Sequence, residues 1–370
     1  MKHKPGLYLA SLLFLTQNVL AGEIDVMTQN QYLGADLTPV LVAAIEGDAF
    51  AFNAAVIDAL VQVSENSTAE RLQAQADLIA KRQPDVVGLQ EVYTFSCYDP
   101  FFTGACADPL IAGAFNNHLD LTLAALGGAY TDRATVVNFN ETVPFDLYGY
   151  GMPALITVTD RDVILARSDL DTTLVDFGCV PPYVSDDGCN YVAAPPPIPT
   201  LLGEINLLRG YIGVDATIDG THYRIVNTHL EVKDPPLQPI IQIGQAQELI
   251  EVLALTTPPE RSLVVLGDIN SNPTEPLPLP YAQFIAFAFT DAWTLRPGDV
   301  AGFTCCQPED LLNEESALYE RIDMVFSREI PLEVKKARVL GDKVSSKTHP
   351  PGEGLWPSDH GAVAARLLYP

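Results

Sequence analysis

Residues 263–273, with the sequence LVVLGDINSNP, constrain the fold of this chain most strongly. Four consecutive apolar residues predict a short buried strand, which stops at Gly267. Asp268 and Asn270 follow, and Pro273 prevents a return to the sheet. Acid and amide side chains at the carboxyl end of a buried strand lie in the crevice where open α/β sheets bind ligands. Taken alone, the same residues also suit a strand that ends in an Asx turn.

The pattern recurs in four other stretches. This recurrence favours a functional site over an isolated Asx turn. Residues 85–91, 223–229 and 321–326 are apolar runs that carry or end in a polar group, and residues 358–361 precede a further apolar run. The polar side chains they supply are Glu91, Asn227, His229, Asp323, Asp359 and His360. Burying so many ionisable groups is costly unless they are paired or hold a metal. One shared cation would account for all of them.

The overall charge limits the classes of partner. The chain of 370 residues has a net charge of −26 and is 18% charged and 48% hydrophobic, which is an ordinary globular composition. Such acidity argues against a broad basic track for nucleic acid. It does not exclude a nuclease, because a bound divalent cation can supply positive potential locally.

The first residues match a targeting segment. Lys2 and Lys4 precede a mostly apolar stretch at 7–15, and Val-Leu-Ala at 19–21 suits a cleavage site after Ala21. The alternative is an N-terminal anchor, but the apolar stretch is short for spanning a bilayer. We therefore expect residues 1–21 to be a signal peptide, residues 22–370 to form one domain without a transmembrane segment, and the protein to be secreted or periplasmic.

Six cysteines agree with an oxidising compartment. Cys97 and Cys106 bracket a short loop, as do Cys179 and Cys189, so we expect two local disulfides, while the adjacent Cys305 and Cys306 stay open between free, bridged to each other and bonded elsewhere. The six allow about 15 pairings, so this is a preference from proximity. No Cys-x-x-Cys spacing indicates a zinc or thioredoxin-type centre.

Periodicity predicts an α/β fold. We expect strands at 23–30, 85–91, 161–167 and 263–266, and a hairpin of 210–218 with 223–227 that turns at Asp219 and Gly220. Helices are expected at 39–63, 69–82, 118–127, 240–256 and 281–293. Residues 93–117 are expected to be a long loop and 177–203 a surface excursion, which makes both of them insertions in the domain.

The motifs, in their order, resemble the endonuclease/exonuclease/phosphatase superfamily. They are Leu-Gln-Glu at 89–91, Asn-Thr-His-Leu at 227–230, Gly-Asp-Ile-Asn-Ser-Asn-Pro at 267–273, Arg-Ile-Asp at 321–323 and Ser-Asp-His at 358–360. Each motif is weak alone, but the ordered set is specific and runs from Asn30 to His360. The superfamily includes pancreatic-type deoxyribonucleases, apurinic endonucleases, secreted sphingomyelinases and inositol polyphosphate phosphatases. The resemblance implies a four-layer α/β sandwich, in which two packed mixed β-sheets are flanked by helices.

The resemblance also implies a metal site. A hard divalent cation with oxygen ligands neutralises a phosphate and stabilises the leaving oxygen. Glu91 is the ligand that the resemblance indicates first, and Asn30 and Asp359 would complete or flank the site. The expected cation is Mg²⁺, with Mn²⁺ or Ca²⁺ as alternatives.

Five residues would carry the chemistry. Asp268 would orient or deprotonate the attacking water, and Asn270 would hold the water or the phosphate. His360 would donate to the charged phosphate, with Asp323 holding its tautomer and raising its pKa. His229 resembles the second histidine of the deoxyribonuclease and sphingomyelinase branches, which would donate to the phosphate or protonate the leaving group.

Several of these residues have structural alternatives. Asn30 and Asn227 could be satisfied strand-end amides, although we favour a role in the site for both. Asp323 could pair with Arg321, and Glu91 could cap a turn. Aromatic residues at 281–289 could form a membrane-docking hairpin, but we favour the core for them.

The sequence therefore predicts an exported, divalent-metal-dependent phosphoesterase that hydrolyses a phosphodiester and acts as a monomer. A nuclease is one candidate. A secreted sphingomyelinase-like or small-molecule phosphodiesterase or phosphatase is another, and its substrate would be a lipid or small molecule. A non-catalytic binding or toxin subunit on the same fold is a third, because fold alone never secures function. The intact set of acids and histidines counts against that third class.

Overall fold

The computed structural model describes residues 22–200, 203–233, 238–276, 279–331, 333–348 and 354–370. The predicted signal peptide at 1–21 lies outside these described residues. Within them, no helix combines the length and apolar character needed to cross a membrane.

The first sheet contains seven strands, in the order β16-β17-β1-β2-β5-β3, with β4 added on β5. Its central pair, β1 and β2, is parallel, and β17 joins β1 in the antiparallel sense. The strands are β1 (Glu23–Asn30), β2 (Val86–Gln90), β3 (Thr94–Tyr98), β4 (Tyr130–Phe145), β5 (Ala154–Arg167), β16 (Glu333–Leu340) and β17 (Ala362–Leu368).

The second sheet contains eight strands, in the order β14-β15-β13-β12-β11-β8-β7, with β6 added on β11. They are β6 (Thr172–Leu174), β7 (Val184–Ser185), β8 (Gly188–Asn190), β11 (Gly210–Ile218), β12 (Thr221–His229), β13 (Ser262–Asp268), β14 (Thr290–Asp291) and β15 (Asp323–Ser327). The β11–β12 hairpin turns at Asp219 and Gly220, both with positive φ, as predicted. A separate ladder pairs β9 (Ile198–Thr200) with β10 (Gly203–Ile205).

Six α-helices are described: α1 (Thr38–Glu46), α2 (Ala49–Glu65), α3 (Thr68–Arg82), α4 (His118–Ala125), α5 (Gln238–Thr256) and α6 (Leu279–Ala286). Local chemistry sets their ends. Gly47 ends α1 with a left-handed backbone, and the Asp48 carboxylate accepts from the first N–H groups of α2. Pro84 follows the last residues of α3, where the chain turns into β2.

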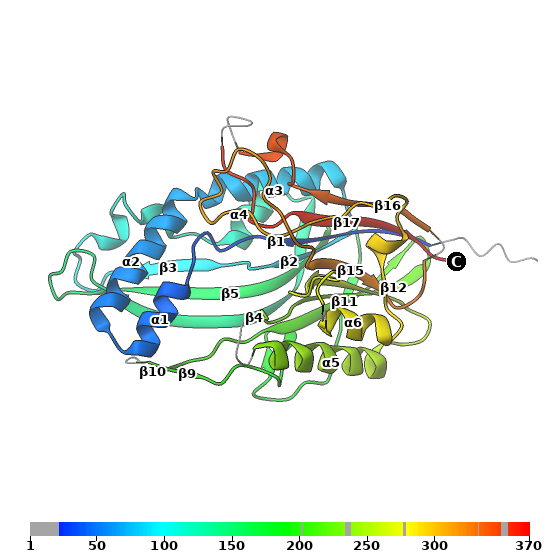
Figure 1. Cartoon of the computed structure of the whole chain (residues 1–370), viewed down its shortest axis with the longest axis horizontal. Helices are drawn as coiled ribbons and strands as arrows, with labels where there is room; N and C mark the ends of the chain where they lie inside the picture. The colour runs from blue at the N-terminus through cyan, green and yellow to red at the C-terminus, as the bar shows by residue number, and fades with distance from the viewer. Residues whose placement is uncertain (1–21, 201–202, 234–237, 277–278, 332, 349–353) are drawn as a thin grey trace, which may run out of the picture.

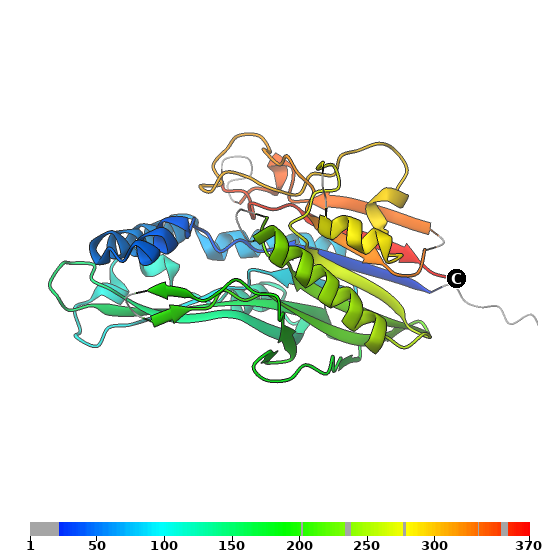
Figure 2. The same ribbon diagram turned by 60° about the horizontal axis from the view of Figure 1, so that its bottom comes forward.

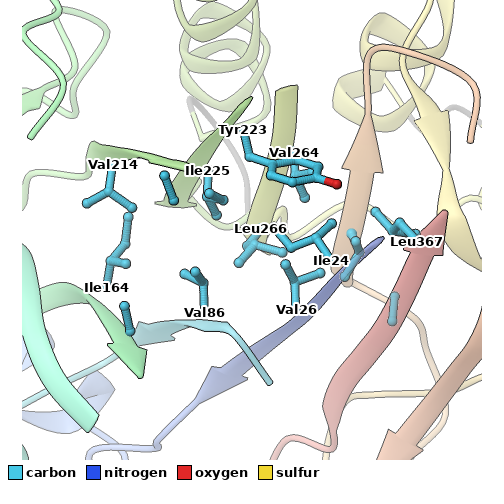
Figure 3. Packing of buried hydrophobic residues seen from close by; sticks show 14 of the residues in the cluster. Ile24, Val26, Val86, Ile164, Val214, Tyr223, Ile225, Val264, Leu266 and Leu367 are labelled. Carbon is cyan, nitrogen blue, oxygen red and sulfur yellow. The ribbon is translucent and has the colours of Figure 1, made fainter. Parts of the chain in front are cut away.

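The two sheets pack face to face, and helices cover their outer faces (Figures 1 and 2). Val26, Val86 and Ile164 of the first sheet meet Ile225 and Leu266 of the second in the central core (Figure 3). Helices α3 and α4 pack on the first sheet, and α5 and α6 pack on the second. This is the predicted four-layer sandwich.

One end of the molecule extends beyond the sandwich. There β3, β4 and β5 continue past the second sheet, and α1 and α2 lie beside them (Figures 1 and 2). Val56 and Leu60 of α2 pack with Phe95 of β3 and Ile156 of β5 in a satellite core. The long strand β4 was not predicted, because its sequence YTDRATVVNFNETVPF alternates polar and apolar residues without a continuous apolar run.

Three predicted loops or helices need correction. The expected loop at 93–117 contains β3, which pairs with β5. The expected excursion at 177–203 supplies β8, which joins the edge of the second sheet through β11. The expected helix at 281–293 ends at Ala286, and Phe284 and Phe289 are buried against the second sheet while Phe287 is 51% exposed. The aromatic residues of this segment are therefore mainly core.

The cysteines form three disulfides among the described residues. Cys97–Cys106 and Cys179–Cys189 are the two local bridges that the spacing predicted. The adjacent Cys305 and Cys306 are bridged to each other, which resolves the alternative that the sequence left open.

Candidate active site

Three polar side chains lie in register on neighbouring strands of the second sheet. His229 ends β12 and pairs with Asp268 at the end of β13, and Asp268 pairs with Asp323 at the start of β15. Register alone therefore places them side by side at one edge of the sheet. His229 Nε2 lies 3.5 Å from Asp268 Oδ2.

The first sheet contributes the opposite wall. Asn30 ends β1 and Glu91 directly follows β2, the parallel neighbour of β1. The Asn30 Nδ2 group donates to Glu91 Oε1 at 2.9 Å and to Asp268 Oδ2 at 3.3 Å, so one amide joins the two sheets at the site. Glu91 Oε2 accepts from the Leu33 N–H at 3.0 Å. Glu91 has φ of 55°, a left-handed conformation that costs energy in a non-glycine residue and is typical of functional sites.

His360 closes the group from the loop before β17. Its Nδ1 donates to Asp323 Oδ2 at 2.9 Å and lies 3.9 Å from Asp268 Oδ2. The Ser358 hydroxyl accepts from the His360 N–H at 3.0 Å and donates to the Asn30 carbonyl at 2.8 Å. Potential ligand atoms of Asp268, Asp323 and His360 all lie within 4.8 Å of one another.

Asn270 is held beside Asp268 by a strained turn. Its φ is 51°, and its backbone N–H donates to Asp268 Oδ1 at 3.0 Å. The Asn270 Nδ2 group donates to the Leu230 carbonyl at 2.9 Å and lies 3.2 Å from His229 Nε2. The sequence allowed either an Asx turn or a candidate site at Asp268 and Asn270. The structure has the Asx turn at the residues that form the candidate site.

The two histidines have opposite electrostatic environments. Burial opposes protonation of His360, but the charges of Asp323 and Asp359 outweigh it and hold the His360 pKa well above its ordinary value. Burial, reinforced by the positive charges of Arg209 and His360, holds the His229 pKa well below its ordinary value. The site therefore combines a cationic donor with a neutral imidazole.

Sequence reasoning missed Arg209, which sets the tautomer of His229. Arg209 Nη1 lies 3.1 Å from His229 Nδ1, and Nη2 lies 3.5 Å from Glu231 Oε1. Because a guanidinium only donates, His229 Nδ1 accepts and the proton of the neutral ring lies on Nε2, facing Asp268. Arg209 belongs to no motif, so no signal in the sequence identifies it.

Two buried aspartates were also missed. Asp160 and Asp162 lie on β5, and the Asn138 amide donates to Asp162 Oδ2 at 3.0 Å. Burial raises the pKa of Asp160 to about 7 despite the positive charge of Arg209. Asp162 falls within the strand predicted at 161–167 for its apolar residues, whereas Asp160 lies before it in the part of β5 that was not predicted.

Asn227 does not serve the site in the way that we expected. Its Nδ2 group donates to the Leu89 carbonyl at 2.9 Å and the Val163 carbonyl at 3.1 Å, and its Oδ1 accepts from Gln90 Nε2 at 2.6 Å. All three partners belong to the first sheet, whereas Asn227 lies on β12 of the second. The Asn227 side chain therefore joins the two sheets by hydrogen bonds, next to the candidate site.

Asp323 is also not paired with Arg321, whose Nη2 group lies 2.8 Å from Asp291 Oδ2. Asp323 Oδ1 is buried and has no hydrogen-bond partner among the described residues.

The donor set fits a hard divalent cation. In addition to burial, the Glu91 charge helps to raise the Asp359 pKa, and the Asn30 Nδ2 group bonds both Glu91 and Asp268, so acidic oxygens from both sheets surround the same region. Burial and the charge of Asp323 raise the pKa of Asp268 to about 7, and burial raises that of Asp359 to about 6. Oxygen ligands of this kind are what Mg²⁺, Mn²⁺ and Ca²⁺ prefer. The Asn30 amide presents its nitrogen to Glu91, while its Oδ1 accepts from the Tyr32 N–H at 2.9 Å.

Comparison with solved structures shows the same fold in several proteins. An endonuclease/exonuclease/phosphatase family protein from Bacteroides thetaiotaomicron has a TM-score of 0.55 and 15% identity, over 95% of this chain and 99% of that chain. The mannosyl-6-phosphatase of B. thetaiotaomicron VPI-5482 has a TM-score of 0.53 and 16% identity, over 93% of this chain and 99% of that one. A Leptotrichia buccalis endonuclease/exonuclease/phosphatase family protein has a TM-score of 0.53 and 13% identity, over 93% and 99%.

The sequence comparisons address the family directly. No match was found among curated proteins. The model of the Endonuclease/Exonuclease/phosphatase family matches residues 50–360, which include Glu91, His229, Asp268, Asp323 and His360. The chain therefore belongs to the Endonuclease/Exonuclease/phosphatase family.

Proposed function

We propose that the protein is an exported, divalent-metal-dependent phosphodiesterase. The observation that carries this proposal is the convergence of His360, Asp323 and Asp268 with Glu91 and Asn30, through contacts of 2.9 to 3.9 Å that join the two sheets. A binding protein has no physical reason to keep this many ionisable groups buried at one sheet edge, because each costs free energy to desolvate.

The cation would be held by Glu91 and Asp359, with the amide oxygen of Asn30 as the third predicted ligand. When bound, it would neutralise the phosphate and stabilise the oxygen that leaves. The donor set described above supports this assignment, because hard oxygen ligands match a hard cation.

The protein's own residues would manage the protons. The water oxygen forms a bond to phosphorus, its proton passes to Asp268, and the phosphorus–oxygen ester bond breaks. Protonated His360, oriented by Asp323, would donate a hydrogen bond to the phosphate oxygen that gains charge. Neutral His229 carries its hydrogen on Nε2 and would donate a hydrogen bond to the leaving oxygen, which would take its proton from Asp268 or from water after the ester bond breaks. Asn270 keeps Asp268 in position through its backbone N–H, and Arg209 holds His229 through Nδ1.

Export rests on the charged and apolar pattern of residues 1–21 and on three disulfides, which persist in oxidising compartments. Expression with the native N-terminus tests it. Sequencing of exported protein should begin at Gly22, and retention of residues 1–21 would contradict the cleavage site.

The decisive test measures hydrolysis of bis(p-nitrophenyl) phosphate and nicking of supercoiled plasmid, in Mg²⁺ and in EDTA. His360→Ala should abolish the metal-dependent activity. His222→Ala is the matched control, because His222 is exposed on β12 and its ring bonds only to Thr217 within the described part of the chain. Activity that survives both EDTA and His360→Ala would refute the proposed site.

The two substrates separate the remaining candidates. Plasmid nicking lost in His360→Ala would identify a nuclease. Hydrolysis of the small diester without nicking would indicate a lipid or small-molecule phosphodiesterase, which the net charge of −26 favours. The structural likeness to a mannosyl-6-phosphatase makes sugar phosphates a monoester substrate to include. A folded protein inactive on all of these would support the non-catalytic alternative.

A further inference from the structure

A cavity of about 160 Å³ lies between helices α1 and α2 and the extended strands β3, β4 and β5. It is at the end of the molecule where these strands continue beyond the second sheet (Figure 2). Protein interiors are close-packed and contain few voids larger than a water molecule, so an apolar cavity of this size needs an occupant or a reason. Most of its wall is aliphatic or aromatic, including Val56, Leu60, Phe95, Val143, Ile156 and Leu208.

This cavity borders the candidate active site at Arg209. Arg209, Asp160 and Glu231 line the cavity at that end. Arg209 also lies 3.1 Å from His229 Nδ1, and His229 Nε2 lies 3.5 Å from Asp268. The Arg209 guanidinium therefore lies between His229 of the candidate site and the apolar cavity.

The apolar space continues away from the site. A second cavity of about 320 Å³ shares Ala44 and Phe52 with the first, and Pro144, Phe145 and Pro153 lie in its wall. Along α2, the lining of the first cavity runs from Phe52 to Val63, about 16 Å at 1.5 Å per residue. The two cavities adjoin at Ala44 and Phe52, and their walls are mostly apolar, with the charged side chains Glu141, Asp160, Arg209 and Glu231 in the first and Asp146 in the second. Such walls suit an apolar chain better than a nucleobase or a sugar, which need more polar partners.

We propose that this cavity holds a linear alkyl or acyl chain of the substrate, so that the protein acts on phosphodiesters that carry a long apolar chain. The inference rests on the proposed phosphodiesterase function and names its substrate class. The phosphate would lie at the edge formed by Glu91, Asp268 and His360, and the chain would pass Arg209 into the apolar space. Burial of each methylene favours binding by roughly fourfold, so a chain of several carbons would dominate selectivity.

The test is a series of p-nitrophenyl n-alkyl phosphates with methyl, butyl, octyl and dodecyl groups, assayed with the full chain below their aggregation concentrations. We expect kcat/KM to rise at least about 100-fold from methyl to octyl and to rise further to dodecyl, because an extended octyl chain is shorter than the lining of about 16 Å. Equal kcat/KM for all four esters would overturn the inference and leave the phosphodiesterase proposal intact.

Filling the cavity should remove this preference. Ala59→Phe fills it from α2, and Val158→Phe fills it from the opposite wall on β5. Either variant should lose at least tenfold in kcat/KM on the octyl ester and keep the rate on the methyl ester. Ala54→Phe is the matched control, because Ala54 is exposed on α2 and does not line this cavity. An unchanged octyl preference in both filling variants would overturn the inference.

Binding provides a readout that does not depend on catalysis. A dansyl-labelled undecyl phosphonate should bind the wild-type protein with a rise in fluorescence, and Ala59→Phe should weaken this binding at least tenfold. If no ester is hydrolysed but the probe binds in this way, the phosphodiesterase proposal fails and the chain site stands. If the probe does not bind, or binds equally to Ala59→Phe, the chain site is refuted.

Discussion

Replacement of Arg71 by leucine is expected to lower the free energy of unfolding by about 4.5 kcal/mol. Arg71 is fully buried in α3 and donates to the carbonyls of the loops that carry the site. Its Nε donates to Asn66 O at 2.9 Å, its Nη1 to Gln31 O at 3.1 Å and Pro357 O at 3.3 Å, and its Nη2 to Tyr32 O at 3.2 Å. The loop at 31–33 directly follows Asn30, and the loop at 357–360 includes His360.

The magnitude follows from which carbonyls lose every donor. Gln31 O and Pro357 O also accept from Gln75 Nε2, at 3.1 and 2.7 Å, so each keeps one partner and loses about 0.5 kcal/mol. No second donor to Asn66 O or Tyr32 O is found in the described part of the chain, so each costs about 1.5 kcal/mol when left buried and unpaired. The guanidinium also lies 5.3 Å from the Tyr32 ring centroid, a cation–π contact worth about 0.5 kcal/mol.

Urea unfolding followed by circular dichroism, in EDTA, measures this change directly. Arg338→Leu is the control, since Arg338 is exposed on β16 and its replacement should alter stability by less than about 0.5 kcal/mol. The Arg71→Leu, Gln75→Leu double variant should lose more than the sum of the single losses, because it alone leaves Gln31 O and Pro357 O without a donor. A loss below about 1 kcal/mol for Arg71→Leu, or strictly additive variants, would refute the reasoning.

Three further predictions concern the site and its support. Asp323→Asn should lower kcat/KM about 100-fold by removing the charge that keeps His360 protonated, and it should move the alkaline limb of the pH profile of kcat/KM to lower pH; an unmoved limb in steady-state kinetics would contradict this. Gly88→Ala should destabilise the fold by about 2 kcal/mol, because its Cβ would lie 2.6 Å from Asn227 Oδ1, and an unchanged urea midpoint would contradict this. Burial raises the pKa of Asp160 to about 7, above about 3.9 in an unfolded chain, so folded protein binds the extra proton and stability should fall as pH rises from about 4 through 7. Asp160→Asn should reduce this slope in EDTA without removing it, because the raised pKa values of Asp268 and Asp359 act in the same direction, and parallel melting-temperature profiles for variant and wild type would rule out the Asp160 share.

Much of the framework could be predicted from local patterns. The run at 263–266 and the Asp219–Gly220 turn specify their elements without help from distant residues, because burial and turn chemistry act within a few positions. The layer arrangement followed from the resemblance to the family. The strand β4 was not predicted from the sequence. About half of its residues are polar, and it is stabilised mainly by pairing along β5.

The candidate site also contains residues that the sequence could predict and residues that it could not. Glu91, Asp268 and His360 lie in motifs at strand ends, so their chemistry is visible in the sequence. Arg209 and Arg71 act through partners 20 or more residues away, His229 in one case and the loops at 31 and 357 in the other. Such long-range contacts leave no local pattern, and only the fold reveals them.

The amide of Asn227 has a consequence for how such proteins diverge. Close-packed side chains hold the two sheets together, and the bonds from Asn227 to Leu89, Gln90 and Val163 add directional contacts that fix the position of one sheet on the other near the site. Core residues on either side can then be exchanged over evolutionary time without altering the distance between Asn30 and Asp268. This chain shares its fold with a protein of 15% identity, so most side chains differ between the two while the layers are kept.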